Sequence, residues 1–251
     1  MASMPLYKLT LAYDGTNYAG WQVQPNGLAI QAVVQKKLAL LLRQETDLTA
    51  AGRTDAGVHA RAQTTHFSAP VPLDLFRFTY SLNSVLPPDI RATSVTEMPD
   101  GFHARYSATG KIYTYHLRMA PLQDPFRRLY SWHVPFQDFS LDKMKQGALK
   151  LLGTHNFKGF ASEASQGVAS YDAIRTLRRL EIIEGPETTL LFEADGFLYK
   201  MVRNLAGTLV DIGRSHLPLE VIDQVLTTQD RRLAGQAAPA HGLFLDSVLY
   251  S

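Results

Sequence analysis

The sequence predicts an α+β protein of two related halves, whose mostly antiparallel sheets meet at a central cleft and carry helices on their outer faces. Segments with a strand period and segments with a helix period both occur, but they do not alternate regularly as in a parallel sheet. Asp-Gly dipeptides end a predicted strand in each half, at 14–15 and 195–196. We therefore place a boundary near residue 107, between an N-terminal half (1–106) and a C-terminal half (107–251).

In the first half, residues 7–13 alternate apolar and polar side chains as a half-buried strand does. Apolar residues at helical spacing predict an amphipathic helix over 29–43. A second helix is expected over 73–83, because the chain must leave helical geometry before Pro87. A strand over 90–97 follows it.

The second half repeats this theme of strands and helices. A strand period indicates three strands in it, and a helix period indicates three helices. The expected strands cover 111–118, 188–194 and 243–249, and the expected helices cover 141–152, 198–212 and 219–226.

Composition limits the function without defining it. The 251 residues are 45% hydrophobic and 19% charged, which is typical of a globular protein and predicts no membrane role. The start of the chain has no basic segment followed by an apolar core, so we expect no secretory signal and a cytoplasmic location. The absence of cysteine excludes disulfides, thiolate catalysis and cysteine-ligated metal centres.

A net charge of +2 does not by itself indicate a polyanionic partner, so an RNA-binding surface would have to come from local clusters of basic residues. Arginines do cluster, and each cluster is either a set of phosphate contacts or a solvated surface. The clusters are Arg175 with Arg178 and Arg179, Arg127 with Arg128, Arg231 with Arg232, and Arg53 with Arg61.

Residues 51–60, Ala-Gly-Arg-Thr-Asp-Ala-Gly-Val-His-Ala, are the most informative segment. Gly52 and Gly57 permit positive φ and close backbone approach, so the segment predicts a tight loop that presents Asp55 to a ligand. Arg53 offers donors for a phosphate or for Asp55 itself. The alternative is an Asx turn in which Asp55 only caps its own backbone.

This loop resembles the signature of the bacterial tRNA pseudouridine synthase A family, in which it carries the catalytic aspartate. Other segments resemble that family in the same order along the chain, from about residue 9 to residue 249. These segments are 9–22, Phe102-His103-Ala104-Arg105 with 108–115, 155–160, 197–205 and 242–245.

The resemblance implies a role for each of five residues. Asp55 would act as the nucleophile or base, and Arg203 would form an ion pair with it. Tyr113 would lie against a flipped uracil, and Leu243 would form an apolar wall beside that base. Arg53 would contact the RNA backbone and fill the space that the flipped nucleotide leaves. Judged from residue type alone, the tyrosine and the leucine would be core residues and Arg203 an exposed helix residue.

The resemblance also implies the reaction and the partners. The reaction would isomerise uridine to pseudouridine at positions 38–40 of the tRNA anticodon stem-loop, with no metal and no cofactor. The target base must leave its stack before a side chain can reach it. Of the pair Tyr113 and Tyr115, we expect only one to face the cleft. Family members resemble homodimers in which one tRNA spans both subunits.

Two other functions are open at this stage. Asp55, His59 and His66 could serve a metal-dependent hydrolase, although Gly57 disfavours the helix that would align the first two as ligands. A non-catalytic RNA-binding module would use the same arginines and tyrosines to bind a stem-loop, and would show affinity without turnover.

Overall fold

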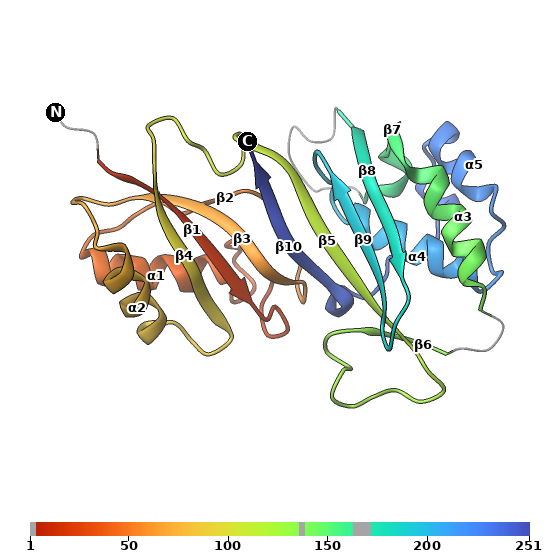
Figure 1. Ribbon diagram of the computed structural model, residues 1–251, viewed down its shortest axis with the longest axis horizontal. Coiled ribbons are helices and arrows are strands. Elements are labelled where there is room, and N and C mark those ends of the chain that lie inside the picture. The colour runs from red at the N-terminus through yellow and green to blue at the C-terminus, as the bar shows by residue number, and fades with distance from the viewer. Residues whose placement is uncertain (1–3, 136–138, 163–171) are drawn as a thin grey trace. The chain divides into compact units, whose positions relative to one another are not determined.

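The computed structural model describes residues 4–135, 139–162 and 172–251 (Figure 1). Contacts divide the chain into two compact units, unit 1 (Met1–Thr109 with Phe244–Ser251) and unit 2 (Gly110–Leu243). The predicted C-terminal half covers all of 107–251, whereas the last strand groups with unit 1 because it pairs with a strand of that unit.

The sheet of unit 1 has the strand order β4-β1-β3-β10. Its central strand β1 (Leu6–Tyr13) is antiparallel to both β3 (His59–Ser68) and β4 (Ile90–Met98). β10 (Leu243–Tyr250) runs parallel to β3, and the short β2 (Thr49–Ala50) is antiparallel to it. The N-terminus of β3 follows the Asp55 loop directly, so this strand fixes where the loop leaves the sheet.

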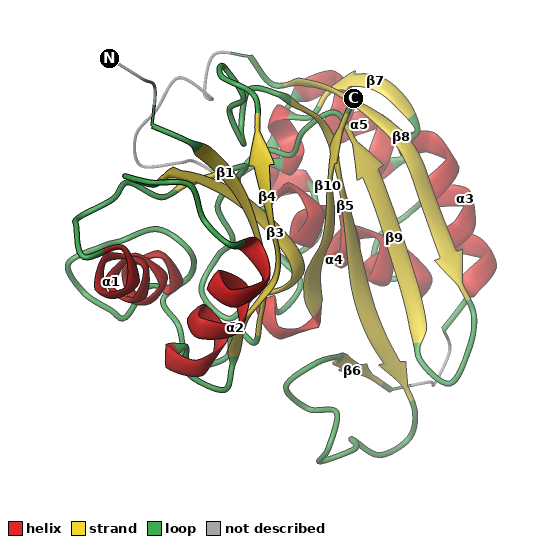
Figure 2. Ribbon diagram, turned by 60° about the vertical axis from the view of Figure 1, so that its left-hand side comes forward, coloured by secondary structure: helices red, strands yellow, loops and turns green. Residues whose placement is uncertain are grey.

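Two helices, α1 (Ile30–Leu42) and α2 (Leu75–Val85), lie side by side next to this sheet (Figure 2). α1 buries Val34 and Leu38 on one stripe of helical period, as predicted. α2 begins where the Asp74 side chain accepts a hydrogen bond from the backbone N–H of Arg77, which satisfies one of the donors at the helix start.

The sheet of unit 2 is antiparallel in the order β5-β9-β8-β7. Its strands are β5 (Ala108–Met119), β9 (Thr188–Ala194), β8 (Ile174–Ile183) and β7 (Gly153–Asn156). The short β6 (Trp132–Val134) pairs in parallel with the end of β5.

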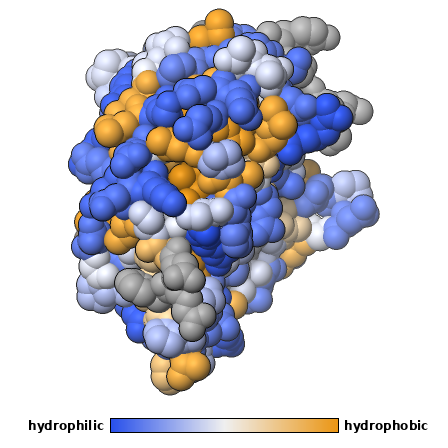
Figure 3. Space-filling model, turned by 90° about the vertical axis from the view of Figure 1, so that its right-hand side faces the viewer, coloured by the Kyte–Doolittle hydropathy of each residue, from blue (hydrophilic) through white to orange (hydrophobic). Residues whose placement is uncertain are grey.

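Helices α3 (Leu141–Leu151), α4 (Met201–Gly213) and α5 (Val221–Thr228) cover one face of this sheet (Figure 2). Every residue of α4 except Arg203 is buried, so α4 is the central element of the unit. On the side of the molecule that carries α3 and α5, hydrophilic side chains cover most of the surface and separate the apolar patches (Figure 3).

These elements confirm the predicted α+β class with mostly antiparallel sheet. Among the described residues, no helix is long and apolar enough to cross a membrane. The prediction missed β3 and β8. β3 buries polar side chains such as Gln63 and Thr65, which hides the alternation that a half-buried strand shows. β8 carries three arginines, two of them adjacent, so its sequence lacks the clear alternation that predicts a strand.

Candidate active site

The Asp55 loop is fixed by backbone and side-chain bonds on both sides of the aspartate. The Val58 N–H donates to the Asp55 carbonyl at 3.1 Å, and Gly57 has a φ of 76°. The Thr54 carbonyl accepts from the Trp21 N–H at 3.0 Å, and its hydroxyl lies 2.8 Å from the hydroxyl of Tyr13. Of the two glycines in the predicted loop, Gly57 is the one that uses positive φ.

Two glycines of the segment after β1 lie against this loop, so closely that a residue with a side chain would not fit in their place. A Cβ on Gly20, whose φ is 92°, would lie 2.6 Å from the Thr54 carbonyl oxygen. A Cβ on Gly15 would lie 2.0 Å from the Val58 carbonyl oxygen. Backbone of the preceding segment is therefore in van der Waals contact with the loop. Asp55 is partly exposed, and Arg53 is exposed.

The exit of the loop into β3 is held by a stack of side chains. The His59 ring stacks on Phe244 with centroids 4.5 Å apart, and the Arg61 guanidinium lies 4.4 Å from the same phenyl ring. Arg61 also forms an ion pair with Asp246, which lies two residues after Phe244 on β10. Nδ1 of His59 accepts a hydrogen bond from the Gly15 N–H, so β3, β10 and the glycine segment are tied together.

In unit 2, Arg203 occupies the first turn of α4 and is the one residue of that helix that is not buried. Its Nε–H donates to the Ala238 carbonyl at 2.8 Å, and the Ala238 N–H donates back to the Arg203 carbonyl at 2.9 Å. The first bond restrains the guanidinium, and the second joins the backbone of Ala238 to α4. The positive charge also acts on Tyr115: burial raises the pKa of that phenol, and Arg203 opposes the rise.

Tyr113 and Tyr115 are both buried on β5, with 8% and 0% exposure. They are two residues apart on an unbroken ladder with β9, so their side chains project from the same face. The expectation that only one of them faces the cleft stays a prediction, and the position on the strand alone does not distinguish the two side chains. The Tyr113 ring meets Phe197 edge-on at 5.2 Å, whereas the Tyr115 hydroxyl donates to the Pro239 carbonyl at 2.8 Å.

Leu243 is 5% exposed and is the last residue of unit 2, directly before Phe244 in the chain. Its neighbour Gly242 packs on Tyr115, since a Cβ there would lie 2.7 Å from the phenol ring. Of the five predicted site residues, Arg53 and Asp55 thus share one loop of unit 1. Tyr113, Arg203 and Leu243 belong to unit 2.

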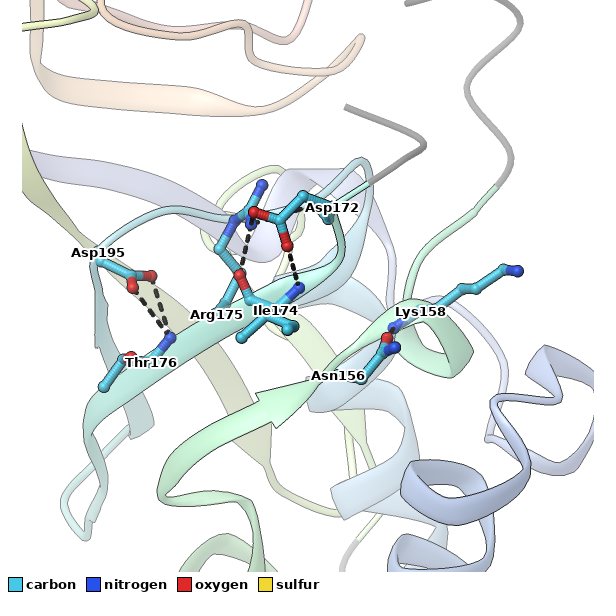
Figure 4. Close-up of polar contacts among 7 residues, drawn as sticks. All are labelled: Asn156, Lys158, Asp172, Ile174, Arg175, Thr176 and Asp195. Carbon is cyan, nitrogen blue, oxygen red and sulfur yellow. Dashed lines mark hydrogen bonds and ion pairs between the residues drawn. The ribbon is translucent and has the colours of Figure 1, made fainter. Parts of the chain in front are cut away.

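Many of the clustered arginines make polar bonds within the protein. Arg175 donates to the Asp172 and Ile174 carbonyls, next to Thr176, whose backbone N–H donates to both carboxylate oxygens of Asp195 (Figure 4). In the same view Asn156 accepts from the Lys158 N–H (Figure 4). The other paired arginines are Arg179 with Glu181, Arg127 with Glu187, and Arg232 with Asp230.

The ligand set of the hydrolase alternative does not converge. His59 and His66 stand seven residues apart on one strand, which separates them by roughly 20 Å. The Nδ1 atoms of both histidines accept backbone N–H bonds, from Gly15 and Ala104. Within the described ranges, no group of three histidine, aspartate or glutamate side chains is placed to hold a metal ion.

The sequence matches a family of enzymes of the isomerase class. A family described as tRNA pseudouridine synthase matches residues 10–107 and 148–251, which include the Asp55 loop, α4 and β10.

Two relatives extend the match over nearly the whole chain. A tRNA pseudouridine synthase A from Protochlamydia amoebophila is 47% identical over 98% of this chain and 97% of its own length. One from an Exiguobacterium species is 44% identical over 97% of both chains. The chain belongs to the tRNA pseudouridine synthase family.

Proposed function

We propose that this protein isomerises uridine to pseudouridine at positions 38–40 of the tRNA anticodon stem-loop, with Asp55 as the nucleophile or base. The observation that carries the proposal is the rigid presentation of Asp55, with Gly20 and Gly15 against its loop and Thr54 bonded on its N-terminal side. An Asx turn with no chemistry would not require two glycines to approach the loop from another segment. Family membership supplies the reaction class.

The reaction needs no change in oxidation state. The bond between the sugar C1′ and the base N1 breaks, the uracil turns, and C1′ bonds to the base C5. The C5 hydrogen leaves as a proton, and N1 gains one. Asp55 either attacks C1′ or adds to the uracil ring, and in both cases its carboxylate must be ionised and close to the flipped nucleotide.

The other four residues have supporting roles in this proposal. Arg203 would form an ion pair with Asp55, and the bond from its Nε–H to the Ala238 carbonyl already restrains its side chain. Tyr113 and Leu243, which are 8% and 5% exposed, would supply apolar surface to the extruded uracil. Arg53 is exposed and would contact the RNA backbone. These roles require the two units to form one cleft, as the sequence predicted.

The first test uses an unmodified tRNA transcript that carries tritium at uridine C5, with a chelator present and no added cofactor. We expect the wild-type protein to release tritium and Asp55→Asn to release none. Asp47→Asn is the matched control, because it makes the same change at an exposed carboxylate outside the loop. Release by Asp55→Asn at the wild-type rate would refute the role of Asp55. Tight tRNA binding without release by the wild type would favour the RNA-binding module.

The second test concerns the position of the target. Three transcripts, each keeping a single uridine among positions 38, 39 and 40, should all release tritium, whereas a transcript with none should not. The expected homodimer is checked by light scattering with and without tRNA, and the expected cytoplasmic location by cell fractionation. Release from the transcript that lacks all three uridines would move the target elsewhere in the tRNA.

A further inference from the structure

Residues 231–239, which we name the strap, run along α4 and are bonded to it at successive points. The Gly235 N–H donates to the Thr208 hydroxyl at 3.0 Å, and Thr208 in turn donates to the Asn204 carbonyl. A Cβ on Gly207 would lie 1.8 Å from the Gln236 carbonyl oxygen, so strap and helix are in backbone contact there. The last of these bonds is the reciprocal pair between Ala238 and Arg203.

At the start of the strap, Arg231 bonds to Asn204, the residue after Arg203. Nη2 of Arg231 donates to the Asn204 side-chain oxygen at 2.9 Å, and Nη1 donates to the Ala234 carbonyl at 3.2 Å. Asn204 is fully buried, and its amide donates to the Phe160 carbonyl at 2.8 Å. Both hydrogen-bonding sides of the Asn204 amide are therefore used, which fixes its rotamer.

Two features distinguish the start of α4 and its contacts with the strap from an ordinary helix N-terminus. In the described part of the chain, no carboxylate pairs with Arg231, although the residue is half-buried and burial lowers the pKa of its guanidinium. Lys200, directly before α4, has a φ of 58°, which is uncommon for a residue with a side chain. Local departures of this kind concentrate where a site must be held in one geometry.

We propose that Asn204 and Arg231 are positioning residues, which hold the strap on α4 so that the Ala238 carbonyl keeps the Arg203 guanidinium in one orientation. Neither residue needs to touch the RNA. This inference rests on the proposed function for its effect on turnover, because Arg203 is a site residue only if that function is right. The part of the inference that concerns the orientation of the Arg203 side chain does not depend on the proposed function.

The test compares Arg231→Lys with Arg232→Lys in the full-length protein. Lysine keeps the charge but not the two-pronged geometry that reaches Asn204 and Ala234 together. Arg232 is the matched control, because it is the adjacent residue, is 89% exposed and pairs with Asp230. Asn204→Ser is the second variant, since it shortens the other partner of the same bond.

Two measurements are made on each variant, well below its melting temperature. The first is the exchange of the Arg203 Nε–H with solvent by ¹⁵N NMR, with its signal assigned by its loss in Arg203→Lys. We expect exchange to rise about tenfold or more in Arg231→Lys and to stay unchanged in Arg232→Lys. The second is tritium release from tRNA, where we expect kcat to fall about tenfold with KM within about twofold.

The outcomes separate this inference from the proposed function. Unchanged Arg203 exchange in both Arg231→Lys and Asn204→Ser overturns the positioning role, whatever happens to turnover. Faster exchange with an unchanged kcat overturns the link to catalysis. If the wild type itself does not act on tRNA but Arg203 exchange responds as expected, the positioning role stands and the proposed function fails. An equal loss of kcat when Arg231→Lys is added to Arg203→Lys would show a general structural effect and also overturn the link.

Discussion

The Asp55 loop and the N-terminal end of α4 each hold one charged side chain, but by different physical means. In addition to the hydrogen bonds of Thr54 and Val58, close packing positions the Asp55 loop, because Gly20 and Gly15 let backbone approach backbone until no side chain fits between. Arg203 is positioned by polar partners, because Ala238, Asn204 and Arg231 bond to it or to its neighbours. The loop should therefore be sensitive to added atoms, and the helix end to lost hydrogen bonds.

The largest effect that this comparison predicts is that of Gly20→Ala. A methyl group there would lie 2.6 Å from the Thr54 carbonyl oxygen on a residue whose φ is 92°. We expect the free energy of unfolding to fall by about 3 kcal/mol and kcat on tRNA to fall about 100-fold, because the Asp55 loop must move. Urea denaturation and tritium release measure the two quantities.

Gly101→Ala is the matched control for strain alone. Gly101 has a φ of 89°, but a Cβ there would meet no atom within 4 Å. We expect a loss of about 1 kcal/mol of stability and no change in kcat. Equal effects of the two substitutions would mean that backbone strain, and not the close approach of Gly20 to Thr54, decides the result.

A smaller effect is expected at Gly207 in α4. Alanine is a better helix former than glycine by about 1 kcal/mol, but a methyl group would lie 1.8 Å from the Gln236 carbonyl oxygen and push the strap away. We expect Gly207→Ala to lower the free energy of unfolding by about 2 kcal/mol and kcat by more than Arg231→Lys does. Thermal melting and single-turnover kinetics test both parts.

Gly147→Ala in α3 is the corresponding control, since this glycine is also buried inside a helix. A Cβ there would meet the side-chain ends of Leu209 and Ile222, which can shift. We expect a change within about 1 kcal/mol and unaltered turnover. A loss at Gly147 as large as that at Gly207 would show that crowding anywhere on α4, and not displacement of the strap, lowers activity.

The sequence was sufficient for elements whose side chains follow a simple period. The strand expected over 7–13 is Leu6–Tyr13, and the helix expected over 29–43 is Ile30–Leu42. The helix expected over 198–212 begins three residues later, at Met201, because Lys200 takes a left-handed conformation that no local pattern signalled.

The candidate site was predictable only where its residues are close together in the sequence. The glycines around Asp55 predicted a loop, and Gly57 adopts positive φ in it. Gly20 lies more than thirty positions earlier, and nothing in its own neighbourhood shows that it packs on Thr54. The strap has no helical or strand period, so its bonds to Asn204 depend on tertiary packing that sequence periodicity does not encode.

The smallest expected effect is at Asp230, directly before the exposed end of the strap, whose carboxylate accepts hydrogen bonds from the guanidinium and the backbone N–H of Arg232. These bonds lower the pKa of Asp230 to about 2, below the value of about 3.9 of an unfolded aspartate. A depressed pKa stabilises the folded state above the unfolded value, and this contribution is lost as the pH falls from about 4 to 2. The free energy of unfolding of the wild type and of Asp230→Asn should therefore differ slightly at pH 5 to 7, by less at high salt, and converge near pH 2.

The exchange of the Arg203 Nε–H should not change in Asp230→Asn, because the bonds to Asn204 and Thr208 hold the strap further along. A faster exchange in Asp230→Asn would mean that the exposed end of the strap, and not its buried contacts with α4, controls the arginine.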